Sequence, residues 1–303
     1  MPKRMESAQF FQDYLNVKKQ IINQALESYL PELAFPQKLQ DAMRYSVFAG
    51  GKRIRPIMTL AATELCGGDE SRALPVACAI ELVHTYSLIH DDLPAMDDDD
   101  MRRGRLTNHK VYGEAIAILA GDTLMTYAYH LISREYRNMD LSPAIVLRLI
   151  EELGDATGIS GMAGGQVIDL ESEGKDISSD ELKKLHELKT GALIKASLRC
   201  GAIIAGADEL SLQRITNYAH HLGIVFQIID DILDVTGTTE ALGKPAGSDE
   251  KNNKTTYVSL YGLEKAKLMA EEETKVAYDE IRHFGEGGRF FTSLIDYFLK
   301  RES

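Results

Sequence analysis

The sequence has few cysteines, no excess of basic residues and no long uninterrupted apolar run. Its three cysteines, Cys66, Cys78 and Cys200, are widely separated and form no C-x-x-C pair. This excludes a disulfide-rich fold and the usual zinc-binding spacing, and it predicts reduced, mostly buried thiols in a cytoplasmic protein. The 34 Lys and Arg residues against 46 Asp and Glu give a net charge of −12. Nucleic acid is therefore not an expected partner, since binding it requires a basic surface.

We expect no membrane span, because no stretch reaches the roughly 18 consecutive apolar residues that a span requires. The first six residues contain no apolar signal core. Since the chain also contains no Pro- or Ser-rich linker and no repeat of 20–50 residues, we expect residues 1–303 to form one large domain.

Apolar residues recur at three- and four-residue steps, which predicts a nearly all-α fold. The clearest examples are Tyr14, Val17, Ile21, Ile22 and Leu26, and then Leu182, Leu185 and Leu188. Pro56 favours a helix start and the pair Gly67 and Gly68 a helix end, while residues 178–181 (SSDE) are typical of a capped start. Segments 116–132 and 222–235 are apolar on most faces, which predicts two central helices of a bundle.

Two aspartate clusters follow apolar helical segments, one in each half of the chain. The first occupies residues 91–100 (DDLPAMDDDD) and the second residues 230–234 (DDILD). In the second, Asp230, Asp231 and Asp234 share one helix face among isoleucines and a leucine, so three carboxylates are brought together near buried surface. A hard divalent cation such as Mg²⁺ would compensate this charge, which predicts a metal site shared with substrate phosphates.

Other interpretations of the first cluster remain. For Asp98, Asp99 and Asp100, a solvated acidic face is as plausible as a metal site. A calcium loop fails, because placing Gly104 at its sixth position puts Met101 and Arg103 where oxygen ligands are required. Pro94 should end the helix, so Asp97 would have to return toward Asp91 through a turn.

Basic residues are concentrated in a few places. Residues 50–56 (GGKRIRP) form a glycine-rich turn with three cations before a helix start, which suits a phosphate or diphosphate. Arg102 and Arg103 follow the first aspartate cluster directly, and further cations are Lys189, Lys244 and Lys254. The sequence has no P-loop, no G-x-S-x-G turn and no evident Cys–His pair. Metal and cations would therefore act on a departing diphosphate.

These motifs together resemble the trans-prenyl diphosphate synthases. The two aspartate-rich motifs, Arg102-Arg103-Gly104, residues 51–56, residues 161–169 (GMAGGQVID), residues 189–191 (KTG) and Phe226-Gln227 occur in that family's order. The match runs from about residue 42 to about residue 257, and it is closest to the bacterial farnesyl diphosphate synthases. It implies an all-α bundle of the isoprenoid synthase type with a central active-site cavity, and a homodimer.

The resemblance also implies roles for individual residues. Asp91, Asp97, Lys189 and Asp230 would be catalytic. Isopentenyl diphosphate would be held by Lys52, Arg55, His84 and Arg103. The allylic diphosphate would be held by Arg102, Lys189, Thr190, Gln227, Lys244 and Lys254. Three Mg²⁺ ions, with Mn²⁺ as a possible substitute, would be bound by Asp91, Asp92, Asp97, Asp230, Asp231 and Asp234. Without the resemblance, His84 would be read as a buried, hydrogen-bonded histidine.

The implied reaction condenses isopentenyl diphosphate with dimethylallyl and then geranyl diphosphate to give the C15 product. Tyr86, five residues before Asp91 and so about 7.5 Å along the helix, would form the floor that limits chain length, with the small Ser87 beside it. Tyr86 is also the right size for plain core. The alternatives are a C20 geranylgeranyl diphosphate synthase, a terpene cyclase, a non-catalytic partner subunit and a metal-buffering protein.

Overall fold

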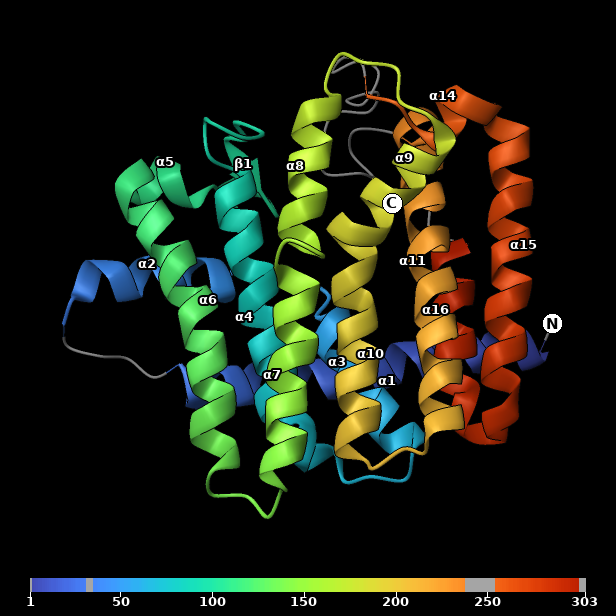
Figure 1. Cartoon of the computed structure of the whole chain (residues 1–303), viewed down its shortest axis with the longest axis horizontal. Helices are drawn as coiled ribbons and strands as arrows, with labels where there is room; N and C mark the ends of the chain where they lie inside the picture. The colour runs from blue at the N-terminus through green and yellow to red at the C-terminus, as the bar shows by residue number, and fades with distance from the viewer. Residues whose placement is uncertain (1, 31–34, 238–253, 300–303) are drawn as a thin grey trace.

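The computed structural model describes residues 2–30, 35–237 and 254–299, and nearly all of these residues are helical (Figure 1). The predicted all-α bundle is confirmed. The first half contains α1 (Pro2–Tyr29), α2 (Gln37–Val47), α3 (Ile54–Leu65), the 3₁₀ turn η1 (Glu70–Ala73), α4 (Leu74–Asp91), β1 (Met101–Arg102), β2 (Arg105–Leu106), α5 (Asn108–Tyr112) and α6 (Glu114–Tyr136).

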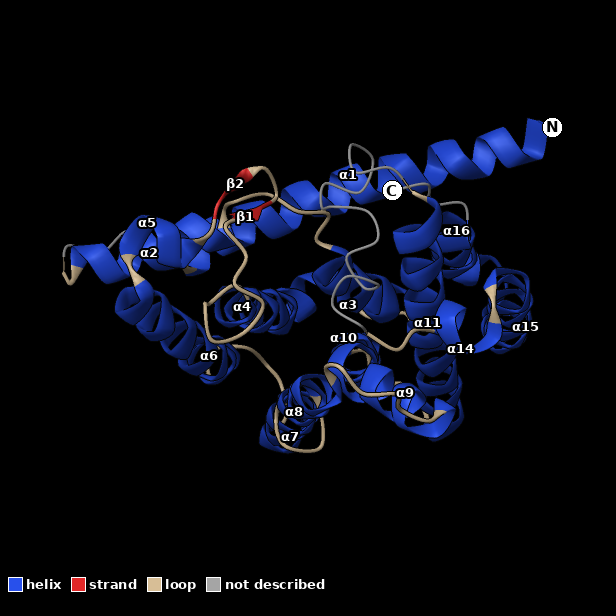
Figure 2. Cartoon of the chain, turned by 90° about the horizontal axis from the view of Figure 1, so that it is seen from above, coloured by secondary structure: helices blue, strands red, loops and turns tan. Residues whose placement is uncertain are grey.

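The second half repeats the pattern of long helices joined by short connections. It contains α7 (Pro143–Thr157), α8 (Met162–Ser172), α9 (Ser179–His186), the π-helical turn η2 (Glu187–Gly191), α10 (Ala192–Ile204), α11 (Glu209–Thr236), α14 (Tyr257–Tyr261), α15 (Leu263–Ile281), the 3₁₀ turn η3 (Arg282–Gly288) and α16 (Arg289–Leu299). Seen from above, α3 and α10 lie in the middle of the bundle and α1 crosses one side of it (Figure 2).

One hydrophobic core runs through the described helices. Its buried side chains extend from Phe11 in α1 to Phe298 in α16, and α10 packs against both α3 and α11. This is what the helical periodicity predicts, because apolar stripes on amphipathic helices must be buried against one another. The arrangement supports the expectation of one domain, which stays a prediction.

The helix boundaries follow local signals. Helix α9 begins at a capping box. The Ser178 hydroxyl accepts from the Glu181 backbone N–H, and the Glu181 carboxylate accepts from the Ser178 backbone N–H. Pro56 lies in the first turn of α3, and Gly67 adopts a φ of +75° just after that helix ends. The start and stop signals in these two segments were therefore correctly interpreted.

The prediction that α6 is central in the bundle is wrong. Figure 1 shows α6 at the side of the molecule, and Ile118, Leu119 and Met125 on its outer face are 44%, 50% and 38% exposed. Helix α6 is apolar on two faces. One face packs on α4, so an apolar composition did not require a central position. The other face carries the exposed residues Ile118, Leu119 and Met125.

Two helical segments are long and apolar enough to cross a membrane by length and composition alone. These are Glu70–Asp91, with a mean hydropathy of 1.2, and α6, with a mean hydropathy of 1.3. The core helices of a bundle have the same composition, and 67% and 39% of the two windows are buried, so the expectation of no membrane span stands as a prediction.

Candidate active site

A cavity of about 1000 Å³ opens at the end of the bundle where α4, α8, α9, η2 and α11 meet the loop after α4. Its lining includes Arg55, His84, Asp99, Asp100, Arg102, Arg103, Asp169, His186, Lys189, Thr190, Gln227, Asp230, Asp231 and Lys254, with Leu88, Leu182, Leu185 and Phe226 as apolar wall. Residues far apart in the sequence, and from both halves of the chain, therefore share one space. A charged cavity with an apolar wall suits a substrate with a charged head and a hydrocarbon tail.

The first aspartate motif is folded back on itself. Helix α4 ends at Asp91, and the chain turns through Pro94 so that the backbone N–H of Asp97 donates to the carbonyl of Asp91 over 2.9 Å. The helix ends here because proline supplies no N–H and its ring disfavours continued helix. This turn returns Asp97 to the neighbourhood of Asp91, as the position of Pro94 predicts.

The environment of Asp91 disfavours its negative charge. Burial, opposed by Lys189 and reinforced by Asp97, raises the pKa of Asp91 to about 6. A carboxyl near other carboxylates is held partly neutral unless a cation joins it. Because Lys189 contributes to this balance, Asp91 lies within electrostatic reach of the cavity that Lys189 lines.

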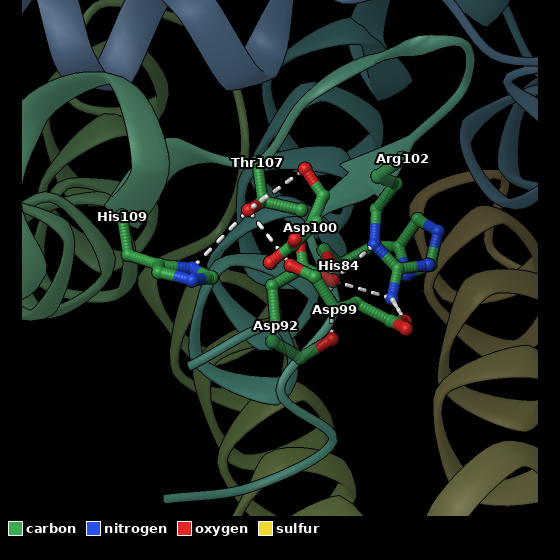
Figure 3. Close-up of polar contacts among 8 residues, drawn as sticks. His84, Asp92, Asp99, Asp100, Arg102, Thr107 and His109 are labelled. Atoms are coloured by element: carbon green, nitrogen blue, oxygen red, sulfur yellow. Dashed lines mark hydrogen bonds and ion pairs between the residues drawn. The ribbon is translucent and has the colours of Figure 1, made fainter. Parts of the chain in front are cut away.

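Asp92 is directed elsewhere. Its Oδ1 accepts from Nε of Arg102 over 2.6 Å, and the Arg102 guanidinium also approaches Asp99 at 3.4 Å (Figure 3). Burial raises the pKa of Asp92 to about 6 despite this ion pair. The contact shows Asp92 holding Arg102, which lines the cavity. The metal-binding role that the resemblance implies for Asp92 stays a prediction.

The second aspartate motif lies on α11 across the cavity. Asp230 and Asp231 line the cavity together with Gln227 one turn earlier. Asp231 is buried, and its Oδ2 accepts from the backbone N–H of Tyr257 over 2.7 Å, at the first turn of α14. Asp234 is 2% exposed and follows on the same helix face. Only Asp230 of the three is half-exposed toward the cavity.

A lysine–aspartate–lysine cluster lines the same cavity. Asp169 Oδ2 lies 2.6 Å from Lys189 Nζ and 3.5 Å from Lys254 Nζ. Burial raises the pKa of Asp169, but the two ammonium groups outweigh it and hold that pKa below its ordinary value. Asp169 is thus ionised and positions two cations at the cavity, although sequence analysis assigned it no role.

A π-helical turn presents Lys189 and Thr190. Helix α9 passes into η2, whose wider turn interrupts the α-helical phase between α9 and α10. Such turns are uncommon and occur mostly at functional sites. A Cβ on Gly165 of α8 would lie only 2.2 Å from the backbone nitrogen of Lys189, so the two backbones can pack this closely only because residue 165 has no side chain.

A second basic group lies on the other side of the cavity. Arg55, His84 and Arg103 line it together, and the Nε of Arg55 is buried without a hydrogen-bond partner in the structure. Burial, followed by the charges of Arg55 and Arg103, lowers the pKa of His84 well below its ordinary value. His84 is therefore a neutral imidazole that lines the cavity, and the group as a whole suits an anion.

Arg103 reaches this group through a tight hairpin that the sequence did not predict. β1 and β2 pair antiparallel with Met101 opposite Leu106, and the turn residues Arg103 and Gly104 have φ values of +54° and +74°. Nη1 of Arg103 donates to the Gly50 carbonyl over 2.5 Å, and a Cβ on Gly51 would lie 2.8 Å from this guanidinium. The glycine-rich turn therefore holds the Arg103 guanidinium in place, and it can do so because residue 51 has no side chain.

Two cations of the glycine-rich turn have different surroundings. Arg53 is buried, with Nη1 2.5 Å from Glu81 Oε1, and so stabilises the turn from inside. Lys52 is exposed and lies over the Tyr297 ring, outside the cavity lining. Lys244 lies outside the described residues.

Tyr86 faces a different part of the bundle from His84 and Leu88. It is half-buried, its ring contacts His90 edge-on at 5.8 Å, and burial, with Tyr129 and Asp91, raises its pKa to about 12. Ser87 donates to the His84 carbonyl. Neither residue is part of the cavity lining, so Tyr86 lies beside the cavity.

Two further polar side chains received no role from the sequence: His186, and Gln166, which lies in the motif at residues 161–169. His186 lines the cavity, and burial lowers its pKa to about 4, while its Nδ1 is buried without a partner. Gln166 Nε2 is likewise buried without a partner. His186 lies three residues before Lys189, and Gln166 lies three residues before Asp169. Residues three apart share a helix face, so this spacing could have placed both side chains near the site.

Comparison with known proteins agrees with this geometry. The sequence matches the polyprenyl synthetase family over residues 36–284. It is 47% identical over 291 residues to a farnesyl diphosphate synthase of Geobacillus stearothermophilus, covering 96% of this chain and 98% of that protein. It is 46% identical over 277 residues to the heterodimeric geranylgeranyl pyrophosphate synthase large subunit 1 of Arabidopsis thaliana, covering 90% and 74%.

Among solved structures, an FPP/GFPP synthase from Zymomonas mobilis superposes with a TM-score of 0.86 at 36% identity, covering 96% of this chain and 99% of that one. The chain therefore belongs to the polyprenyl synthetase family and has the isoprenoid synthase fold. The predicted family is confirmed, and with it the assignment to the prenyltransferases.

Proposed function

We propose that the protein is a farnesyl diphosphate synthase. It would condense isopentenyl diphosphate with dimethylallyl diphosphate and then with geranyl diphosphate. The observation that carries this proposal is the shared cavity, in which Asp230 of the second aspartate motif, Lys189 and Arg103 come from three separated segments of the chain. The farnesyl diphosphate synthase of Geobacillus stearothermophilus, similar over nearly its whole length, supports it further.

Two cation groups support two diphosphate substrates. Arg102, Lys189 and Lys254 lie near the aspartates and would hold the diphosphate that leaves. Arg55 and Arg103 form the second group, with the neutral imidazole of His84 beside them, and would hold isopentenyl diphosphate. Lys52, which lies outside the lining, would assist them. A terpene cyclase needs no such second group, and a non-catalytic subunit needs neither complete aspartate motif, so a synthase accounts for more of the site.

Carboxylate oxygens are suitable ligands for Mg²⁺, and the raised pKa of Asp91 marks the kind of charge that a bound cation relieves. We propose that Asp91 and Asp97 on one side and Asp230 on the other hold the metal, with three ions per site and Mn²⁺ as a substitute. When bound, the ions would neutralise the charge of the departing diphosphate. Asp92 and Asp231 would act mainly by holding Arg102 and α14 in place.

In the proposed reaction, Lys189, Lys254 and Arg102 stabilise negative charge on the leaving diphosphate as the allylic C–O bond breaks. The apolar wall, including Leu88 and Phe226, keeps water from the allylic cation. The double bond of isopentenyl diphosphate, held by the second cation group, attacks C1 of that cation in a 1′–4 coupling. The released pyrophosphate then accepts the proton that the new cation loses.

The test is to incubate the purified protein with isopentenyl and dimethylallyl diphosphates, with and without Mg²⁺, and to identify products by mass spectrometry. We expect a Mg²⁺-dependent C15 diphosphate. A C20 product would favour the second candidate, a geranylgeranyl diphosphate synthase. The similarity to the Arabidopsis thaliana subunit supports this candidate. Pyrophosphate release from a single longer allylic substrate, without condensation, would indicate a terpene cyclase.

Chain length provides a specific prediction. Replacing Tyr86 with Ala should shift the main product from C15 to C20 or longer, because it removes a ring that packs against the hydrophobic core beside the cavity. Product lengths from the two proteins, measured at equal conversion, would show the shift. Tyr129→Phe is the matched control, since it changes a tyrosine near Tyr86 but keeps its aromatic ring. An unchanged C15 product from Tyr86→Ala would refute the floor hypothesis.

Metal dependence should vary with pH. Since the pKa of Asp91 is raised to about 6, this carboxyl becomes protonated below that pH and must lose its proton to bind Mg²⁺. We expect the apparent Mg²⁺ affinity to fall about tenfold per pH unit below pH 6 and to level off above it. Isothermal titration with a non-reactive allylic diphosphate analogue at pH 5–8 would measure this. A flat profile would contradict the assigned role of Asp91.

We also propose a homodimer in the cytoplasm. The exposed apolar residues Ile118, Leu119 and Met125 on α6 supply a face that a second copy would cover. The three cysteines are free, which suits a reducing compartment. Sedimentation velocity should show a dimer that Leu119→Glu dissociates, while a wild-type monomer would overturn the assembly.

A further inference from the structure

A second group of potential metal ligands lies beside the first aspartate motif and shares no residue with the proposed Mg²⁺ ligands. It consists of Asp98 and Asp100, in the loop after α4, and His109 in α5. One carboxylate oxygen from each aspartate and one ring nitrogen of His109 all lie within 4.8 Å of one another. Figure 3 shows the His109 ring directed toward the loop that carries Asp100.

A hydrogen-bond chain determines which nitrogen of His109 carries its proton. The Thr107 hydroxyl lies 2.8 Å from the Asp99 carbonyl, which can only accept, so Thr107 donates its single proton there. The same hydroxyl lies 3.2 Å from Nδ1 of His109. With its proton already used, the Thr107 oxygen can only accept, and Nδ1 of His109 must donate to it. In the tautomer that can bind a metal ion, Nε2 then carries the lone pair.

That lone pair has no partner in the structure. His109 is 6% exposed, and its Nε2 is fully shielded from solvent without a hydrogen bond. A buried polar atom without a partner costs about 1–3 kcal/mol. A histidine whose Nδ1–H is anchored by an oxygen acceptor and whose Nε2 is bare has the arrangement typical of a metal ligand.

We propose that Asp98, Asp100 and His109 form a site for a divalent transition-metal ion, separate from the substrate-linked Mg²⁺ site. One imidazole nitrogen with two carboxylate oxygens favours ions such as Zn²⁺, Co²⁺ or Mn²⁺ over Mg²⁺, which prefers oxygen alone. With metal–ligand distances of about 2.0–2.2 Å, the donors must approach one another by about 1 Å. The aspartates are exposed, and can make this movement.

One cation already competes for this site. Lys110 Nζ lies 2.6 Å from Asp100 Oδ1, and this hydrogen bond raises the pKa of Lys110. The exposed lysine can move to solvent, or the ion can use the other oxygen of Asp100. A bound ion would link the loop after Asp97 to the start of α5, and so stiffen the hairpin that carries Arg102 and Arg103.

The probe is Co²⁺, added to the full-length protein without substrate and with Mg²⁺ in large excess. Equilibrium dialysis gives the stoichiometry, and the visible absorption of Co²⁺ reports a nitrogen ligand. We expect one Co²⁺ per chain. The double variant Asp98→Asn/Asp100→Asn, at exposed positions that tolerate the change, should lose it, as should His109→Gln. Asp91→Asn/Asp97→Asn and His130→Gln, which alters an exposed histidine, should both retain it.

Thr107 provides a test of the hydrogen-bond chain itself. Thr107→Val removes the acceptor for Nδ1–H and should weaken Co²⁺ binding by about 10–100-fold, whereas Thr107→Ser keeps the hydroxyl and should bind like wild type. Three outcomes would overturn the proposal: no bound Co²⁺, binding that survives in Asp98→Asn/Asp100→Asn, or binding lost in Asp91→Asn/Asp97→Asn. None of these readouts depends on catalytic activity, so they stand apart from the proposed function.

Discussion

Replacing Asp91 with Asn should lower kcat/KM for condensation by about three orders of magnitude. The change removes a charge from the group proposed to hold Mg²⁺ against the leaving diphosphate, and such transition-state contacts contribute about 10²–10³ in rate or more. The fold should survive, because the wild-type carboxyl is already partly neutral near pH 6 and the amide has the same shape.

Steady-state kinetics at saturating Mg²⁺, with circular dichroism to confirm folding, would measure this effect. Asp279→Asn is the matched control. It alters an aspartate that is 70% exposed in a surface ion pair with Arg282, and its expected effect on kcat/KM is negligible. Activity within tenfold of wild type in Asp91→Asn would remove Asp91 from the catalytic machinery.

Gly165→Ala should have the second-largest effect. The added methyl would lie 2.2 Å from the backbone nitrogen of Lys189 and 2.6 Å from its Cα, both in the π-helical turn, so α8 and η2 must separate. Such overpacking costs about 1–3 kcal/mol of folding free energy. It also moves Lys189 from Asp169 and from the leaving diphosphate, so we expect kcat to fall at least about tenfold as well.

Gly154→Ala makes the same chemical change in helix α7, where the nearest atom to the new methyl is the Tyr129 hydroxyl at 3.8 Å. It should stabilise the protein by about 0.4–1 kcal/mol, since alanine restricts the unfolded chain. Urea unfolding and kcat for the two variants provide the comparison. Equal behaviour of the two would show that the close approach at Gly165 has no bearing on the site.

Much of this site follows from local rules that a sequence displays. Pro94 ends α4 at the first aspartates, the three-residue spacing of α11 places Asp231 and Asp234 together, and the capping box at Ser178 starts α9. These depend on interactions within a few residues along the chain. The order of the motifs was enough to identify the family, which the comparison confirmed.

Other assignments depend on which side chains meet across the bundle. Arg53 and Arg55 are two residues apart, yet Glu81 on α4 holds Arg53 inside while Arg55 lines the cavity. The ion pair between Asp92 and Arg102 could not be predicted, because only the hairpin brings Arg102 back to Asp92. Asp169 received no role because its significance comes from Lys189 and Lys254, which are 20 and 85 residues further along the chain.

By itself, the sequence determined the helical class, the order of the motifs, and a site made of carboxylate metal ligands and basic residues. Each of these depends on residue type and local spacing. Tertiary structure decided which of those charges face one another. It placed Arg103 on the glycine turn through a hairpin whose turn residues have positive φ, exposed the outer face of α6, and left Nε2 of His109 buried and unpaired. These features depend on contacts between distant segments, and the energy of a buried charge or lone pair is set by those contacts.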